Sequence, residues 1–88
     1  MQGRLPRKPD RLGAARVGFA MVQVESEAIA EIGYDVETSR MFVRFIDGDW
    51  YTYFAVPAGA YEAFVAAESH GRFFHERIRD RYAYRRGR

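Results

Sequence analysis

At 88 residues, of which 48% are apolar and 30% charged, the chain is long enough for one small globular domain. It has no cysteine, which excludes a disulfide framework and a thiolate zinc site, and no apolar run approaches the ~20 residues that span a bilayer. The net charge is only +2, but residues 21–70 hold nine acids and two arginines, whereas residues 71–88 hold seven arginines and two acids. We expect a cytoplasmic protein with no secretory signal and no membrane partner.

Residues 1–20 contain two prolines, three glycines and no sustained apolar period. We expect residues 1–21 to form a disordered or loosely packed basic leader, and Met21 is a candidate alternative start. Residues 22–84 should form a single domain, followed by a frayed basic tail at residues 85–88.

The first strand is expected within residues 22–34. Its alternation is imperfect, because Val22 and Val24 fit one phase and Ile29 falls outside it. A bend or bulge at residues 26–28 would reconcile the two halves. The next run, Arg40 to Phe54, is typical of a β-hairpin, since β-branched and aromatic residues flank an Asp-Gly pair.

The register of this hairpin has two solutions. A two-residue turn pairs Phe45 with Trp50, whereas a three-residue loop with Gly48 in a left-handed bulge pairs Val43 with Tyr51 and Met41 with Tyr53. A slip of one residue moves every side chain to the opposite face. We favour the second register, because it leaves Arg44 and Thr52 facing away from the core.

The face of the sheet that points away from the helices, here called the outer face, then remains apolar. Two short helices cover only one face, and an exposed aromatic cluster usually marks an interface. We therefore expect either the leader or a second copy of the chain to cover it. The apolar residues predicted there are Phe42, Ile46, Trp50 and Phe54.

Two helices follow the hairpin. Pro57 suits the first helical position of one, and Gly71 is expected to cap its end with a positive φ. The spacing of Phe74, Ile78 and Tyr82 predicts a second helix over residues 72–82. The predicted fold is α+β: a three-stranded antiparallel β-meander followed by two helices packed on one face, in the order β-β-β-α-α.

An ordered series of short motifs resembles the KTSC domain, a family named for the C-terminus of some lysyl-tRNA synthetases and also found as short stand-alone bacterial proteins. The series is IGYD at 32–35, MFVRF at 41–45, YTY at 51–53 and SHGRFF at 69–74. The family's Tyr-x-Tyr hallmark corresponds to Tyr51 and Tyr53, and its Ser-x-Gly turn to Ser69 and Gly71. His75 departs from the asparagine that the family commonly has there.

The resemblance covers roughly residues 24–82 and implies no established activity. It implies RNA binding only through the attachment of this domain to a tRNA-charging enzyme, which is an argument from association.

The sequence gives little sign of catalysis. His70 and His75 lie close to Glu68 and Ser69, but two histidines five residues apart across a turn are more often surface residues than a catalytic or metal site. The chain has no H-E-x-x-H, phosphate-binding glycine loop or nucleophile elbow. We expect no enzyme activity, no metal, no cofactor and no small-molecule substrate.

Tyr51 and Tyr53 have two interpretations. Both rings could stack bases, as aromatic residues on RNA-recognition sheets do. The favoured register instead puts them in the core or at its rim, with hydroxyls reaching out. On that register the better candidate surface for stacking or interaction is Phe42, Arg44, Trp50 and Phe54.

The arginines of the C-terminal region also have two interpretations. As a phosphate-binding stripe they would give salt-sensitive affinity for nucleic acid. As a solvated helix face they would form ordinary helix-spaced pairs with acids. The acidic middle of the chain permits only end-on contact with a nucleic acid. The candidates are Arg72, Arg77, Arg79, Arg81, Arg85 and Arg86.

Two functions follow from these patterns. The first is a small non-catalytic module that binds RNA through the arginine-rich second helix and tail together with sheet aromatics. The second is a protein-interaction or homodimerisation module that uses the apolar outer face.

Overall fold

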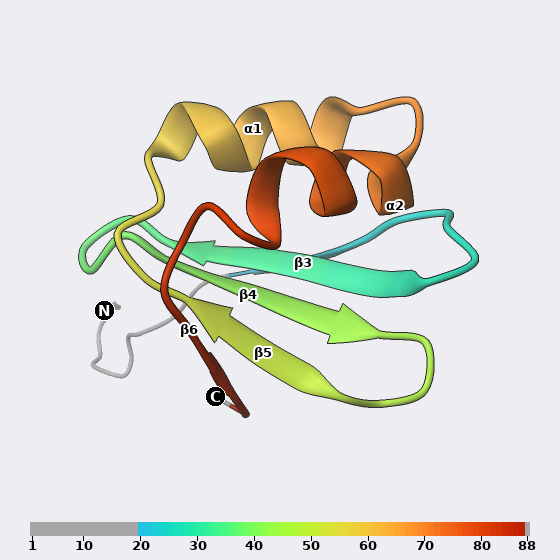
Figure 1. Cartoon of the computed structure of the whole chain (residues 1–88), viewed down its shortest axis with the longest axis horizontal. Helices are drawn as coiled ribbons and strands as arrows, with labels where there is room; N and C mark the ends of the chain where they lie inside the picture. The colour runs from blue at the N-terminus through green and yellow to red at the C-terminus, as the bar shows by residue number, and fades with distance from the viewer. Residues whose placement is uncertain (1–19, 88) are drawn as a thin grey trace, which may run out of the picture.

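The computed structural model describes residues 20–87. They form a five-stranded antiparallel sheet with helices on one face (Figure 1). The α+β class is confirmed. The predicted number of strands is wrong, because the sheet of residues 20–87 has five strands and three were predicted. The sheet order follows the chain, β2-β3-β4-β5-β6, and the elements are β2 Met21–Gln23, β3 Ile29–Asp35, β4 Arg40–Phe45, β5 Trp50–Tyr53, α1 Ala58–Ala66, α2 His70–Phe73, the π-helical η1 Phe74–Ile78 and β6 Tyr84–Arg86.

The first additional strand arises because the chain reverses where a bend was predicted. The Ser26 hydroxyl oxygen accepts hydrogen bonds from the backbone N–H groups of Ala28, at 3.1 Å, and Ile29, at 3.2 Å. A serine that bonds the backbone two residues ahead stabilises a tight turn. As a result β2 folds back on β3, with Met21 opposite Gly33. Met21 thus belongs to the sheet, and residues 1–19 of the predicted leader lie outside the described residues.

The second additional strand is β6, in place of the frayed tail predicted at residues 85–88. It pairs with β5, Tyr84 opposite Tyr53 and Arg85 opposite Thr52. The Thr52 hydroxyl donates to the carbonyl oxygen of Gly87 over 2.7 Å, and Arg86 pairs with Asp49 over 2.9 Å. Residue 88 is outside the described range. The strand forms because the β5 backbone and the side chains of Thr52 and Asp49 provide hydrogen-bond and ion-pair partners for these residues.

We expect Thr52→Val to lower the free energy of unfolding by about 1 kcal/mol, because Thr52 is fully buried and valine keeps its shape without the hydrogen bond to Gly87. Urea unfolding gives the loss, and faster amide exchange at Gly87 locates it. Thr52→Ser, which keeps the hydroxyl, is the control for that exchange. A Thr52→Val protein as stable as wild type, with unchanged exchange at Gly87, would contradict this assignment.

The β4–β5 hairpin has the predicted three-residue register. Val43 lies opposite Tyr51 and Met41 opposite Tyr53. Gly48 has a φ of 99°, a left-handed conformation that glycine adopts without a steric penalty. The N–H of Phe45 donates to the Asp49 carbonyl over 2.8 Å, which closes the loop. The alternating residues of β4 and β5 that face the helices are therefore those predicted.

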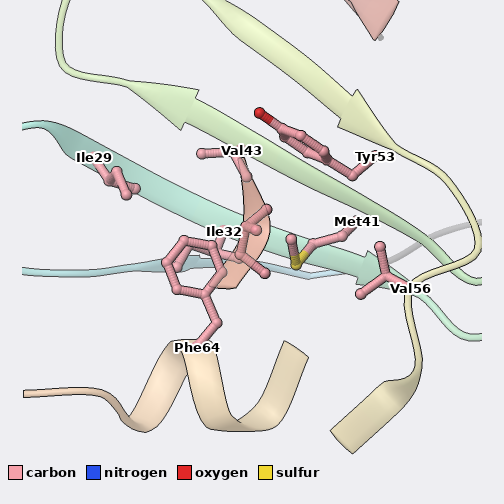
Figure 2. Packing of buried hydrophobic residues seen from close by; sticks show 8 residues of the cluster. Ile29, Ile32, Met41, Val43, Tyr53, Val56 and Phe64 are labelled. Atoms are coloured by element: carbon pink, nitrogen blue, oxygen red, sulfur yellow. The ribbon is translucent and has the colours of Figure 1, made fainter. Parts of the chain in front are cut away.

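The core lies between that face of the sheet and the helices. Phe64 projects from α1 toward Ile32 (Figure 2), and it is fully buried. The connection into α1 is fixed by Tyr34, whose hydroxyl donates to the carbonyl oxygen of Val56 over 2.6 Å and whose ring stacks on Tyr61 at 5.0 Å. The buried cluster consists of Ile29, Ile32, Met41, Val43, Tyr53, Val56, Phe64 and Ile78.

The helical region differs from the prediction at Pro57 and Gly71. Pro57 is the N-cap of α1, one residue before the helix begins. Gly71 lies inside α2 and has no positive φ, so it does not cap α1. Ser69 instead caps α2, because its hydroxyl oxygen accepts from the N–H of Arg72 over 3.2 Å. The second helix is shorter than predicted and ends at Ile78 in a π turn, with the Arg79 N–H bonded to the Phe74 carbonyl.

The outer face carries polar side chains beside its aromatic rings. Phe42 is on it but only 7% exposed, and buried Thr52 lies directly opposite Phe42. The Arg44 guanidinium donates to a Glu31 carboxylate oxygen at 2.9 Å across the same face. The predicted outward positions of Arg44 and Thr52 are confirmed, so charged and hydroxyl side chains alternate with the rings on the outer face in the register of the strands.

Candidate functional site

An open cleft of about 430 Å³ lies beside β5, at the end of the β4–β5 hairpin, and is here called the aromatic cleft. Its residues come from four places: strands β4 and β5, the hairpin loop, the η1 segment with the turn after it, and β6. It is lined by Phe45, Asp47, Asp49, Tyr51, Tyr53, Phe74, Arg79, Asp80 and Tyr84. Its volume is within the range of small-ligand pockets.

The three tyrosines form one ring cluster. Tyr51 and Tyr53 are two residues apart on β5, so they point to the same face, and their centroids are 6.4 Å apart at 20°. Tyr84 on β6 lies 5.7 Å from each of them. Tyr53 is 2% exposed whereas Tyr84 is 57% exposed. The cluster therefore runs from the core to solvent, and Tyr84 is its accessible end.

Two phenylalanines, one from η1 and one from β4, pack against this ring cluster. The Phe74 ring, at the start of the π segment, meets Phe45 edge-on at 5.3 Å and Tyr53 at 5.9 Å. Phe45 in turn meets Tyr51 edge-on at 5.5 Å. Edge-to-face packing of this kind fixes ring orientation as well as burying area. The cleft thus has an aromatic wall whose ring arrangement depends on the π turn that carries Phe74.

The tyrosine hydroxyl at the base of the cluster stays protonated. Burial raises the pKa of Tyr53 well above its usual range, and the neighbouring Tyr51 and Tyr84 add to the effect, which Arg79 partly opposes. Tyr53 therefore acts as a neutral ring at physiological pH and does not supply an anion or a general base.

The charged groups of the cleft differ in whether they have a hydrogen-bond or ion-pair partner within the domain. Asp47 accepts from the N–H of Asp49 over 3.0 Å, and Asp49 accepts from the Arg86 guanidinium over 2.9 Å. Within residues 20–87, Asp80 makes neither a hydrogen bond nor an ion pair through its carboxylate. Arg79 lies beside it, with a guanidinium nitrogen 3.3 Å from Nδ1 of His75. The cleft thus combines rings with one unengaged carboxylate and one guanidinium.

The predicted arginine stripe is divided among separate places. Arg79 lines the aromatic cleft, and Arg86 lies at its rim through Asp49. Arg72 and Arg77 line a different, shallow groove with Glu68 and Glu76, and Arg77 lies over the Phe73 ring at 5.7 Å. Arg81 is exposed in the turn after η1, and Arg85 is opposite Thr52, at an outer-face position.

The predicted outer-face residues do not contribute to the cleft. Phe42, Arg44 and Trp50 hold outer-face positions in the register, and Phe54 lies under the Arg40 guanidinium at 5.4 Å. Sequence reasoning missed Tyr84, Phe45, Phe74 and Asp80 as site residues. The aromatic residues at 82 and 84, spaced as in Tyr51-x-Tyr53, were the one signal that this tail returns to the sheet.

The histidines occupy structural positions. A ring nitrogen of His70, Nε2, is 3.0 Å from the carbonyl oxygen of Val65 at the end of α1, and His75 is exposed beside Arg79. Over residues 20–87 no group of three or more His, Asp or Glu side chains is arranged to hold a metal ion. In that same range no helix is both long and apolar enough to cross a membrane.

Taken together, an antiparallel sheet with two helical segments on one face and a tyrosine cleft at its edge define a small α+β domain built around a Tyr-x-Tyr strand. The chain belongs to the KTSC domain family, whose model matches residues 25–82. The predicted resemblance is confirmed.

Similar proteins include both short and long chains. A Tsukamurella paurometabola protein is 39% identical over 62 residues, covering 70% of this chain and 92% of that one. A lysine–tRNA ligase from Trichormus variabilis is 31% identical over 68 residues, which are 77% of this chain and 12% of the ligase. The crystal structure of a KTSC domain protein from Yersinia pestis, 32% identical, superimposes with a TM-score of 0.75 over 81% of this chain and all of that one.

Proposed function

We propose that the chain is a non-catalytic module that binds single-stranded RNA by seating an unstacked base in the aromatic cleft. The observation that carries the proposal is the gathering of the Tyr-x-Tyr motif, exposed Tyr84 and Arg79 around one open cleft. Single-stranded RNA is commonly recognised by bases splayed out onto aromatic side chains.

Stacking is the main source of affinity in this proposal. Tyr84 is 57% exposed and rests on Tyr51 and Tyr53, so a base laid on it meets a ring that is already held in place. A pre-ordered ring loses little conformational entropy on binding. Stacking of one base on an aromatic side chain is worth about 1–3 kcal/mol.

Electrostatics limits how much RNA the domain engages. Residues 20–87 hold eleven acids and eight arginines, so the described domain is net negative and repels a long phosphate backbone. Arg79, which follows the π turn and lines the cleft, provides positive charge there. This arginine favours contact with one phosphate beside the seated base.

The kinship with a lysine–tRNA ligase supports the same ligand class. That enzyme acts on a tRNA by its name, and the matching segment occupies 12% of its length. A small domain attached to such an enzyme has an RNA substrate close at hand. This support is by analogy and is independent of the cleft geometry.

The test is fluorescence anisotropy of labelled single-stranded RNA octamers of mixed sequence with the full chain at low salt. We expect Tyr84→Ser to weaken binding about 5- to 150-fold, because the stacking ring is lost. Tyr84→Phe keeps the ring and should bind as wild type does.

Absence of measurable binding by the wild-type chain at 50 mM salt would refute the proposal, and so would equal binding by Tyr84→Ser. Truncation after Tyr82 is a poorer test, because it also removes β6 from the sheet. Self-association through the outer face is the competing outcome: a mass that rises with concentration and falls in Trp50→Arg would support it. The cytoplasmic location stays a prediction.

A further inference from the structure

We propose that the aromatic cleft selects guanine, and that Asp80 is the residue that reads it. This inference rests on the proposed RNA-binding function and adds the base that the site prefers. Three of the residues that line the cleft are aspartates, although the carboxylates of aspartates repel the phosphates of RNA. Carboxylates in such a site are useful only toward hydrogen-bond donors.

The three aspartates are not equivalent. Asp49 is bonded to Arg86, and Asp47 accepts the N–H of Asp49 within its own loop. Asp80 lines the same cleft as Tyr84, and both of its carboxylate oxygens are unengaged by residues 20–87. A carboxylate with two available oxygens accepts two parallel hydrogen bonds from one planar partner. Asp80 is therefore the carboxylate of the cleft able to form a bidentate contact.

Among the four RNA bases, guanine matches this acceptor pair. Its Watson–Crick edge carries two adjacent donors, the N1–H and the exocyclic N2 amino group. Uracil offers a single N–H between two carbonyl oxygens, which a carboxylate repels. Cytosine and adenine offer one amino group next to a ring nitrogen acceptor. A base stacked on Tyr84 with its edge toward Asp80 is thus favoured as guanine.

The position of Asp80 makes this contact compatible with the rest of the site. It directly follows Arg79, so the turn after η1 places a carboxylate and a guanidinium side by side. The Asp80 carboxylate accepts hydrogen bonds from the base edge, and the Arg79 guanidinium contacts the phosphate. The π turn that ends at Ile78 sets the position of both residues relative to the rings.

The experiment compares oligouridylate octamers that differ at one central base: guanosine, inosine, adenosine, cytidine or uridine. Anisotropy with the full chain should show the guanosine octamer binding about 5- to 150-fold tighter than the uridine octamer, as expected for one bidentate contact. Inosine, which lacks the N2 amino group, should fall between them. In Asp80→Asn the guanosine preference should shrink to about twofold or less, because an amide offers only one acceptor oxygen.

The matched control is Asp47→Asn, which removes one negative charge from the same cleft and should keep the guanosine preference. Both variants change exposed side chains, and unchanged thermal unfolding confirms that they fold. Equal binding of all five octamers, or a guanosine preference that survives in Asp80→Asn, would overturn the assignment of Asp80 while leaving the RNA-binding proposal intact. Failure of every octamer to bind would overturn both proposals.

Discussion

Phe64→Ala is expected to lower the free energy of unfolding by about 3–5 kcal/mol, the usual cost of truncating a buried phenylalanine. Phe64 is fully buried and is the residue by which α1 enters the core (Figure 2). Its ring stacks on Phe73 at 5.4 Å and lies 6.4 Å from Phe74. The substitution therefore removes contacts between both helical segments and the sheet. Small domains have about 5–15 kcal/mol of stability in total, so a large fraction would be lost.

Urea unfolding followed by circular dichroism measures this loss. The control is Val36→Ala, in the turn between β3 and β4, where the side chain is 73% exposed and the expected change is within about 0.5 kcal/mol. Phe64→Leu, which fills most of the space, should recover much of the stability. If Phe64→Ala cost no more than Val36→Ala, the placement of α1 on the sheet would be wrong.

The second large effect is expected at alkaline pH and arises from Tyr53. Its pKa is raised in the folded state by burial, whereas in the unfolded chain it is that of an ordinary tyrosine, about 10. The unfolded state therefore loses this proton first as the pH rises. The stability that depends on a neutral Tyr53 is fully present below pH 10 and is lost above it, at about 1.4 kcal/mol per pH unit.

Urea unfolding at intervals from pH 8 to pH 11.5 tests this expectation. Tyr53→Phe keeps the ring and removes the titrating group, so its free energy of unfolding should fall less steeply above pH 10 than that of wild type. Partial burial and the charge of Glu62 also raise the pKa of Tyr61, so some alkaline loss should remain. Tyr84→Phe, at an exposed ring of the same cluster, is the control. Parallel curves for wild type and Tyr53→Phe would count against a buried, neutral Tyr53.

The sequence predicted the centre of this fold better than its edges. The hairpin register followed from two local facts, a glycine able to adopt a positive φ and the need to turn Arg44 and Thr52 away from the core. The edge strands have no comparable local signal. β2 and β6 are three residues long each, and they form because the neighbouring strand offers hydrogen bonds to them.

The sequence predicted only the strand part of the candidate site, because the other residues reach it through contacts that have no local signal. The Tyr-x-Tyr pair is a strand motif, and its face followed from the register. Tyr84 and Asp80 reach that motif from more than twenty residues away, after a π turn that no pattern in the sequence indicates. The arginines were predicted to lie on the second helix and in the tail, and the structure divides them among a groove, the cleft and strand β6.

The short strand β6 forms the outer wall of the cleft and lies at the edge of the sheet. All three of its residues are exposed, and a single backbone ladder to β5 holds it, with help from Thr52 and Asp49. Such segments exchange their amide hydrogens by local fluctuations that leave the rest folded. Anything that settles against Tyr84 also holds this strand down. Occupancy of the cleft and detachment of β6 are thus opposing equilibria, and protection of the Gly87 amide, which donates to the Trp50 carbonyl on β5, would report binding from the protein side.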